Sequence, residues 1–315
     1  MLKKGVLLDA ASLGHDIDLD GLKKALGQLT IYDKTEPDQV AERIQGANVI
    51  LTNKVVIDAS AIEESKHDLQ LICVLATGIN NIDLKAAAQA GIPVSNVSAY
   101  GTHSVAQHTL MLMLMLTTRQ PMYQKAVTEG AWNKSPFFCL MQHPVSELAG
   151  QHLVIVGSGE LGRKVAQLAE AFEMKVSFSA RPGNEANDDR ESLDQLLPKA
   201  DILSLHCPLT DSTENLIDAR RLSLAKPELM IINCARGGIV NEEAVLAALQ
   251  TGKISGYGTD VLTQEPPVNG NPLLDALQEN LNLIITPHNA WISQHARQNI
   301  IDQTTRSIQT FTQTQ

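Results

Sequence analysis

The sequence predicts an α/β protein built from two doubly wound parallel-sheet domains, one of them inserted into the other. Strand-like and helix-like stretches alternate through the first hundred residues and again from residue 153 onward. Such alternation is typical of a parallel sheet covered by helices. A helix predicted at 294–310 follows the last strand of the second series, and we expect it to return to the first domain.

The first domain is predicted from short apolar runs that are separated by helical patterns. Its expected strands are residues 5–8, 48–52, 71–75 and 92–94. Its expected helices are residues 19–29, 37–44 and 84–90. We place this domain at residues 1–99 and 289–315.

A strongly apolar segment, residues 105–118, lies near the start of the second domain, which we place at 100–288. The segment is too short, and too interrupted by Gln107 and His108, to span a bilayer. A helix that is apolar all round is usually buried between domains or subunits. We therefore expect a core or interface helix and no membrane contact.

The rest of the second domain follows the pattern of a doubly wound nucleotide-binding sheet. Its expected strands are residues 153–156, 175–178, 202–205, 230–233, 254–257 and 283–286. Helical patterns fall between them, for example at 242–250.

Composition excludes several classes of function. The net charge of −10, from 25 basic and 35 acidic side chains, argues against a surface that binds nucleic acid. The four cysteines form no Cys-x-x-Cys pair and no zinc-spaced cluster, so we expect free thiols in a reducing cytoplasm and no metal. The first apolar run stops at Asp9, too early for a signal peptide.

The most informative motif is Gly157-Ser158-Gly159-Glu160-Leu161-Gly162, which joins the strand at 153–156 to a helical pattern. In this context Gly157 permits a tight turn, Gly159 lets the backbone approach phosphates, and Gly162 lets the helix pack on the strand. The helix N-terminus then supplies free N–H groups and a partial positive charge. We predict that Gly157, Gly159, Glu160, Leu161 and Gly162 bind the pyrophosphate of a dinucleotide.

The residue just beyond the second strand of the nucleotide-binding domain, at 175–178, bears on the choice between NAD(H) and NADP(H). A carboxylate there accepts hydrogen bonds from the adenosine ribose and repels a 2′-phosphate. This chain has Ala180 at that position and Arg181 next to it. Because a guanidinium suits a phosphate, the pair favours NADP(H) over NAD(H). A downstream carboxylate (Glu185, Asp188 or Asp189) that reached the ribose would favour NAD(H) instead.

Three polar residues follow the carboxyl ends of predicted strands, where open α/β sheets bind their ligands: Arg236, Glu265 and His288. Together they suit the reduction of a 2-keto acid. Arg236 can bind the substrate carboxylate and carbonyl. His288 can give a proton to the forming alkoxide, and Glu265 can orient His288 and favour its protonated form.

In these motifs the chain resembles the D-isomer-specific 2-hydroxyacid dehydrogenases over nearly its whole length. The matching segments are the glycine motif, His206-Cys207-Pro208-Leu209-Thr210, Asn233-Cys234-Ala235-Arg236-Gly237, Gly258-Thr259-Asp260-Val261, Glu265-Pro266 and Thr286-Pro287-His288. Further segments resemble the glycerate dehydrogenase (hydroxypyruvate reductase) branch: Thr52-Asn53-Lys54-Val55, residues 76–83, residues 100–108, Gly130-Ala131-Trp132 and His288-Asn289-Ala290-Trp291.

The resemblance implies a nucleotide-binding domain of the Rossmann type inserted into a flavodoxin-like substrate (catalytic) domain. It also implies a homodimer formed through the nucleotide-binding domain. It implies that Arg236, Glu265 and His288 are catalytic and that the backbone at Thr77 and Gly78 holds the substrate carboxylate. The cofactor-contacting residues that it implies are Thr102, Val105, Cys207, Pro208, Cys234 and Asp260. Residues 137–141 either reach a neighbouring active site or simply pack.

The sequence thus predicts a cytoplasmic enzyme that uses NADPH to reduce hydroxypyruvate to D-glycerate and glyoxylate to glycolate. Two alternatives stay open. One is a reductase for another 2-keto acid, of the phenylpyruvate or ketogluconate type. The other is a dinucleotide-sensing corepressor that binds proteins.

Overall fold

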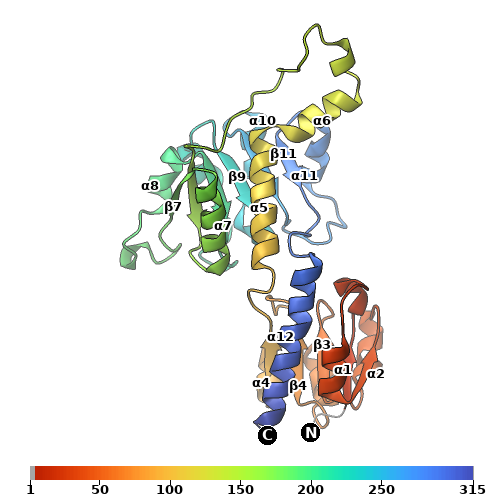
Figure 1. The fold of residues 1–315 in the computed structure, drawn as a ribbon. Coiled ribbons are helices and arrows are strands. Elements are labelled where there is room, and N and C mark those ends of the chain that lie inside the picture. The colour runs from red at the N-terminus through yellow and green to blue at the C-terminus, as the bar shows by residue number, and fades with distance from the viewer. Residues whose placement is uncertain (1–3, 315) are drawn as a thin grey trace. The chain divides into compact units, whose positions relative to one another are not determined.

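Two parallel sheets organise the chain in the computed structural model, which describes residues 4–314 (Figure 1). One compact unit contains the chain up to Gly101 and again from Trp291, and the other runs from Thr102 to Ala290. Each division falls two residues later than we predicted. The first division point lies later than predicted because α5 (Thr102–Thr117) starts at Thr102. The second moves because the N–H groups of Asn289 and Ala290 donate to Asp260, inside the second unit.

The sheet of the first unit has the strand order β2-β1-β3-β4-β5, with every pair parallel. This is the flavodoxin-like doubly wound order. Its strands are β1 (Lys4–Leu7), β2 (Gln28–Ile31), β3 (Val49–Thr52), β4 (Leu71–Val74) and β5 (Val94–Asn96). Its helices are α1 (Asp20–Leu26), α2 (Val40–Ile44), α3 (Ala59–Ser65), α4 (Leu84–Gln89) and α12 (Gln294–Gln313).

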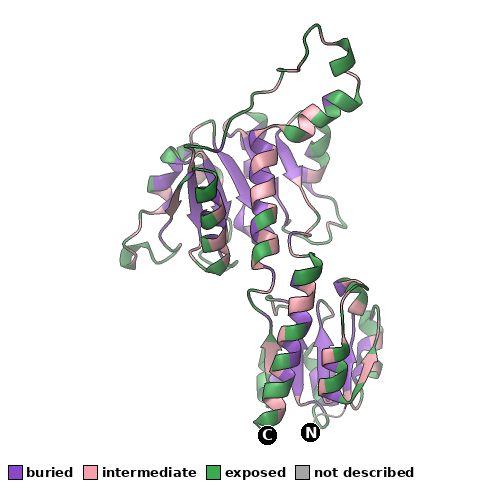
Figure 2. Cartoon of the chain, in the orientation of Figure 1, coloured by how far each residue is buried: buried purple, intermediate pink, exposed green. Residues whose placement is uncertain are grey.

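Alternate strand residues of this sheet supply two separate cores. Val6, Ile50 and Ile72 pack on one face with residues of α2, α3 and α4. Leu7 and Leu51 pack on the other face with residues of α1 and α12. Figure 2 shows these strands buried beneath helices with exposed outer faces. Because α12 covers this sheet, the chain returns to its first domain after the insertion, as predicted.

The sheet of the second unit has the order β11-β10-β9-β8-β6-β7, again parallel throughout. Its strands are β6 (His152–Val156), β7 (Lys175–Phe178), β8 (Ile202–Leu205), β9 (Met230–Asn233), β10 (Gly256–Thr259) and β11 (Leu283–Ile285). The chain places β7 on one side of β6 and β8 on the other. The carboxyl ends of β6 and β8 therefore flank the point where strand order reverses, which is where such sheets bind ligands.

Helices cover both faces of the second sheet. α5 lies side by side with α7 (Glu160–Ala171) over one face (Figure 1). The core of the other face includes residues of α8 (Leu193–Leu196), α9 (Ala219–Leu224), α10 (Glu242–Gln250) and α11 (Pro272–Asp275). α6 (Gln120–Thr128) follows α5. In α5, Leu112, Met113 and Leu116 are fully buried, whereas Leu110 and Leu114 are half-buried. One stripe of the apolar helix is therefore core.

Several predicted elements differ from the observed ones. The helix predicted at 19–29 ends at Leu26, and Gln28–Ile31 forms β2. This strand lies at the edge of the sheet, pairs only with β1 and buries none of its residues. It therefore lacks the longer apolar run from which a strand could be predicted. The strand predicted at 92–94 lies at Val94–Asn96, and α3 and α6 were not predicted.

The strand predicted at 254–257 lies two residues later, at Gly256–Thr259. Two of its four residues are glycines, which interrupt the apolar pattern that predicts a strand. Both glycines are nevertheless needed for packing. A Cβ on Gly256 would lie 2.6 Å from the Asn282 side-chain nitrogen, and one on Gly258 would crowd Leu112 and Leu116 of α5. Within residues 4–314, no helix combines the length and apolarity needed to cross a membrane.

Candidate active site

The turn between β6 and α7 depends on two close backbone approaches. Gly157 has a φ of +108°, and a Cβ there would lie 2.4 Å from the His206 carbonyl oxygen. A Cβ on Gly162 would lie 2.0 Å from the Gly157 carbonyl oxygen. Only glycine fits both positions, because one requires a left-handed conformation and the other allows α7 to pack against the turn.

Gly159 differs from the other two glycines, because a Cβ there would meet nothing within 4 Å. It is the N-cap of α7, so the first N–H groups of this 12-residue helix open onto that space. Glu160 is exposed and accepts a hydrogen bond from the Thr102 hydroxyl at 2.8 Å. Leu161 is half-buried beside it. Open space at a long helix N-terminus fits a pyrophosphate.

In the loop that follows β7, Asp188 and Glu185 are engaged in hydrogen bonds within the loop, and Asp189 is exposed. Ala180 is buried and Arg181 is exposed. The Asp188 carboxylate accepts the Arg181 N–H at 2.8 Å and the Arg190 Nε at 2.8 Å. These bonds hold the pKa of Asp188 well below its usual range and commit this carboxylate to its own loop. Glu185 likewise accepts the Gly183 N–H.

The loops that follow β7 and β8 lie against each other, since a Cβ on Gly183 would come 2.7 Å from Ser212. Arg181 therefore shares an edge of the sheet with Cys207, which is buried, and Pro208, which is exposed. Burial raises the pKa of the Cys207 thiol to about 11.

Cys234, after β9, is also enclosed, and burial raises the pKa of its thiol to about 12. The Cys207 and Cys234 thiols are therefore neutral at physiological pH. Both can pack against a ligand but neither is an activated nucleophile.

Asn233, the last residue of β9, shapes the turn that presents Arg236. Its Oδ1 accepts the Ala235 N–H at 3.1 Å, and its Nδ2 donates to the Arg236 carbonyl at 2.9 Å. The Arg236 guanidinium is exposed and donates to the Ala235 carbonyl at 2.7 Å. We did not predict this role for Asn233, because a side chain that supports its own turn leaves no spacing signal.

Close packing joins the Arg236 turn to the loop that carries Glu265. A Cβ on Gly237 would lie 2.0 Å from the Leu262 carbonyl carbon. The Glu265 Oε1 accepts the Leu262 N–H at 2.8 Å, which leaves Oε2 2.6 Å from the His288 Nδ1. The side chains of His288 and Glu265 are 35% and 32% exposed, so a ligand can reach the pair. The structure thus brings Glu265 and His288 together.

His288 has a left-handed backbone, with a φ of +51°. A histidine in this conformation costs about 1–3 kcal/mol, so the conformation persists only where the surroundings impose it. Asp260 imposes it here: its carbonyl accepts the His288 N–H, and its carboxylate accepts the N–H groups of Asn289 and Ala290. The buried Asp260 carboxylate, predicted to lie near the nicotinamide, therefore anchors the His288 loop.

The remaining predicted residues lie at the start of α5 and in the first unit. Thr102 and Val105 are half-buried in the first turns of α5. In the first unit, Thr77 and Gly78 follow β4, and the Thr77 carbonyl accepts a hydrogen bond from Asn96 at 2.7 Å. No cluster of histidine, cysteine or carboxylate side chains within residues 4–314 could hold a metal ion.

A glycine turn at a strand reversal, with an arginine and a histidine–carboxylate pair at the same sheet edge, defines a dinucleotide-dependent dehydrogenase. Residues 110–290 match the family model "D-isomer specific 2-hydroxyacid dehydrogenase, NAD binding domain". The chain belongs to the D-isomer-specific 2-hydroxyacid dehydrogenases, and it groups with their glycerate dehydrogenase branch.

Two curated relatives are similar over almost their whole length. A glycerate dehydrogenase of Methylorubrum extorquens is 40% identical over 99% of this chain and 96% of its own. A hydroxypyruvate reductase of Blautia hydrogenotrophica is 34% identical over 98% and 96%, respectively. Among solved structures, the TT0316 protein of Thermus thermophilus aligns with a TM-score of 0.83 at 28% identity, over 99% of this chain and 97% of that one.

Proposed function

We propose that this enzyme reduces hydroxypyruvate to D-glycerate, and glyoxylate to glycolate, with NADPH as the hydride donor. The observation that carries the proposal is the 2.6 Å contact between Glu265 Oε2 and His288 Nδ1, in a loop packed against the Arg236 turn. Relatives named glycerate dehydrogenase and hydroxypyruvate reductase support the choice of substrate.

The proposed mechanism divides substrate binding, proton donation and charge stabilisation among a few residues. Arg236 binds the carboxylate and the keto oxygen of the substrate, and the backbone at Thr77 and Gly78 holds the carboxylate. The bound dinucleotide supplies hydride to the keto carbon. The Nε2 of His288 gives a proton to the resulting alkoxide, while Glu265 holds Nδ1 and so fixes the ring. Arg236 and the protonated His288 both stabilise the negative charge that develops on oxygen.

The preference for NADPH rests on the end of β7. Ala180 offers no carboxylate to a ribose, and Arg181 is an exposed guanidinium beside it. The bonds that Asp188 and Glu185 make within their own loop engage two of the three downstream carboxylates, which supports Arg181 as the group that meets the ribose. A guanidinium there would bind a 2′-phosphate with two charge-assisted hydrogen bonds.

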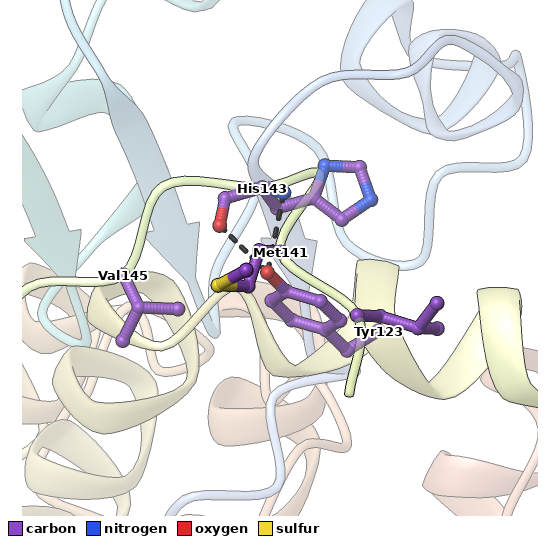
Figure 3. Close-up of a pocket in the computed structure, with 5 residues that line it drawn as sticks. Tyr123, Met141, His143 and Val145 are labelled. Carbon is purple, nitrogen blue, oxygen red and sulfur yellow. Dashed lines mark hydrogen bonds between the residues drawn. The ribbon is translucent and has the colours of Figure 1, made fainter. Parts of the chain in front are cut away.

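We further propose a cytoplasmic homodimer formed through the second unit. The chain that follows α6 projects from this unit as an arm, residues 131–147 (Figure 1). Phe137, Phe138 and Met141 on the arm are 67%, 90% and 78% exposed. A hollow of about 470 Å³ at the base of the arm is lined by Tyr123, Leu140, Met141, His143 and Val145 (Figure 3). Apolar side chains this exposed favour burial against a second copy.

The test is the oxidation of NADPH and NADH, followed by absorbance, with hydroxypyruvate, glyoxylate, pyruvate and phenylpyruvate in parallel. We expect fast NADPH-dependent turnover with hydroxypyruvate and D-glycerate as the product. Turnover of phenylpyruvate alone would contradict the proposed substrate and indicate a bulkier keto acid instead. Cofactor binding without turnover of any of the four would contradict the proposal and favour a dinucleotide-sensing protein.

A further inference from the structure

A hydrogen-bonded chain connects the middle of α5 to the loop of the proposed proton donor. His108 of α5 lies with its Nε2 2.8 Å from the Thr286 hydroxyl, which lies 2.5 Å from Asp260 Oδ1. From this chain we infer that His108 is a positioning residue, which holds His288 in its working geometry through Thr286 and Asp260. The inference rests on the proposed function, since it concerns the alignment of that proton donor.

The chemistry of the three groups fixes the direction of the hydrogen bonds. An ionised carboxylate only accepts, so the Thr286 hydroxyl donates its single proton to Asp260. The Thr286 oxygen must then accept from His108, which requires the hydrogen of the imidazole to be on Nε2. His108 therefore acts as a fixed donor at the start of the chain.

Burial keeps this donor neutral. The pKa of His108 is lowered by desolvation, although the Asp260 carboxylate 3.6 Å away opposes that shift. The Cys234 thiol, which interacts electrostatically with Asp260, is neutral for the reason given above. A neutral His108 contributes hydrogen-bond geometry and not charge, so a neutral amide donor should replace it.

The far end of the chain explains why geometry matters. Asp260 Oδ1, which accepts from Thr286, also accepts the Asn289 N–H at 3.0 Å, and Oδ2 accepts the Ala290 N–H at 2.9 Å. A carboxylate that rotates cannot keep both amides in line. Since these amides follow the left-handed His288 directly, a rotated Asp260 would release the backbone that aims the imidazole at Glu265.

The same helix also contacts the glycine turn. Thr102, in the first turn of α5, donates to Glu160 at the start of α7, and His108 lies less than two turns further along α5. α5 thus connects the proposed dinucleotide turn to the proposed proton-donor loop.

The first test compares His108→Leu, which removes the donor, with His108→Gln, which keeps an N–H donor. His67→Gln changes an exposed histidine of the first unit and serves as the control. With hydroxypyruvate and NADPH, we expect His108→Leu to lower kcat about tenfold to a hundredfold, while KM and the Kd for NADPH change less than about twofold. We expect His108→Gln to restore most of kcat. Equal kcat values for His108→Leu and His67→Gln would overturn the inference.

The second test needs no turnover. Amide hydrogen exchange at residues 288–290 of the unliganded protein should be faster in His108→Leu than in the wild type, and normal in His108→Gln. Thr286→Val should speed exchange at the same amides, and the double variant should add little to either change. If the wild type turns over no keto acid, the proposed function fails while this exchange pattern still holds. Unchanged amide exchange in His108→Leu would overturn the inference that His108, Thr286 and Asp260 act together.

Discussion

At the scale of single residues, the proposed preference for NADPH depends on Arg181. We expect Arg181→Ala to weaken NADPH binding about tenfold to a hundredfold, the effect of losing a charge-assisted bidentate contact. NADH, which lacks the 2′-phosphate, should bind with unchanged affinity. Fluorescence titration of both dinucleotides measures the two constants. An equal loss for both, or no loss for NADPH, would remove the phosphate-binding role from Arg181.

His206 sets a pH dependence of stability. Burial lowers its pKa to about 4, whereas an unfolded chain leaves histidine near its model value of 6.5. As pH falls below 6.5 the unfolded state takes up the proton first, so the stabilisation present above 6.5 is lost progressively down to about 4.

Replacement of His206 by a side chain that does not titrate should remove this dependence. We expect the free energy of unfolding of His206→Gln to fall less than that of the wild type between pH 7 and pH 5, by roughly 2 kcal/mol. Urea unfolding at the two pH values measures the difference. Parallel losses in both proteins would show that His206 is not the group responsible.

The sequence predicted Glu265 and His288 because both follow strand ends in a recognisable order. It did not predict the roles of Asn233 or His108. Asn233 bonds to the backbone of its own turn, and His108 lies 178 residues from the threonine that it contacts. Neither arrangement has a characteristic spacing. The Asn233 bonds become visible only in the folded turn after β9, and the His108 contact only when the sheet edge and α5 are placed together.

At the scale of elements, two glycines in the turn between β6 and α7 have different roles: Gly157 is needed for folding, and Gly159 is proposed to be needed for dinucleotide binding. Gly159 has a φ of −70° and open space around its Cα, so Gly159→Ala should fold normally and lose dinucleotide affinity. Gly157 has a φ of +108° and no room, so Gly157→Ala should cost several kcal/mol, about 1–3 from the backbone and a similar amount from overpacking. Urea midpoints beside NADPH titrations distinguish the two variants. Normal NADPH binding by Gly159→Ala would move the phosphate site elsewhere.

The elements that were predicted well share one property. β7, β8 and β9 were predicted at their observed bounds because β8 and β9 are mostly apolar and all three lie between helical patterns. β2 was missed and β10 was displaced because local sequence does not define them: β2 depends on its pairing with β1, and β10 depends on close packing. β2 buries none of its residues, and β10 carries two glycines whose hydrogens face neighbouring side chains.

At the scale of the whole molecule, the proposed dimer depends on the exposed arm. We expect the wild type to have twice the mass of one chain by light scattering, and Phe137→Ser with Phe138→Ser to shift it toward one chain mass. Val56→Ser, at a side chain 62% exposed in the first unit, is the matched control. A wild-type mass equal to that of one chain would contradict the proposed dimer. An unchanged dimer mass in the double variant would contradict the proposed role of the arm.

The inserted arrangement of the chain was predictable because one helix follows the last strand of the second sheet and carries its own apolar stripe. α12 buries Ile300, Ile301 and Ile308 in the core of the first unit. The division points were predicted only to within two residues, since the first depends on where α5 begins. The second depends on the bonds between the Asp260 carboxylate and the N–H groups of Asn289 and Ala290.

The central claim is that His288, oriented by Glu265, protonates the substrate oxygen. The most direct measurement is kcat for hydroxypyruvate reduction by His288→Ala, set beside its Kd for NADPH. We predict a loss in kcat of about a thousandfold, within the range for a removed general acid, and a Kd within about twofold of the wild type. Equal losses in kcat and in cofactor affinity, or an unchanged kcat, would contradict the claim.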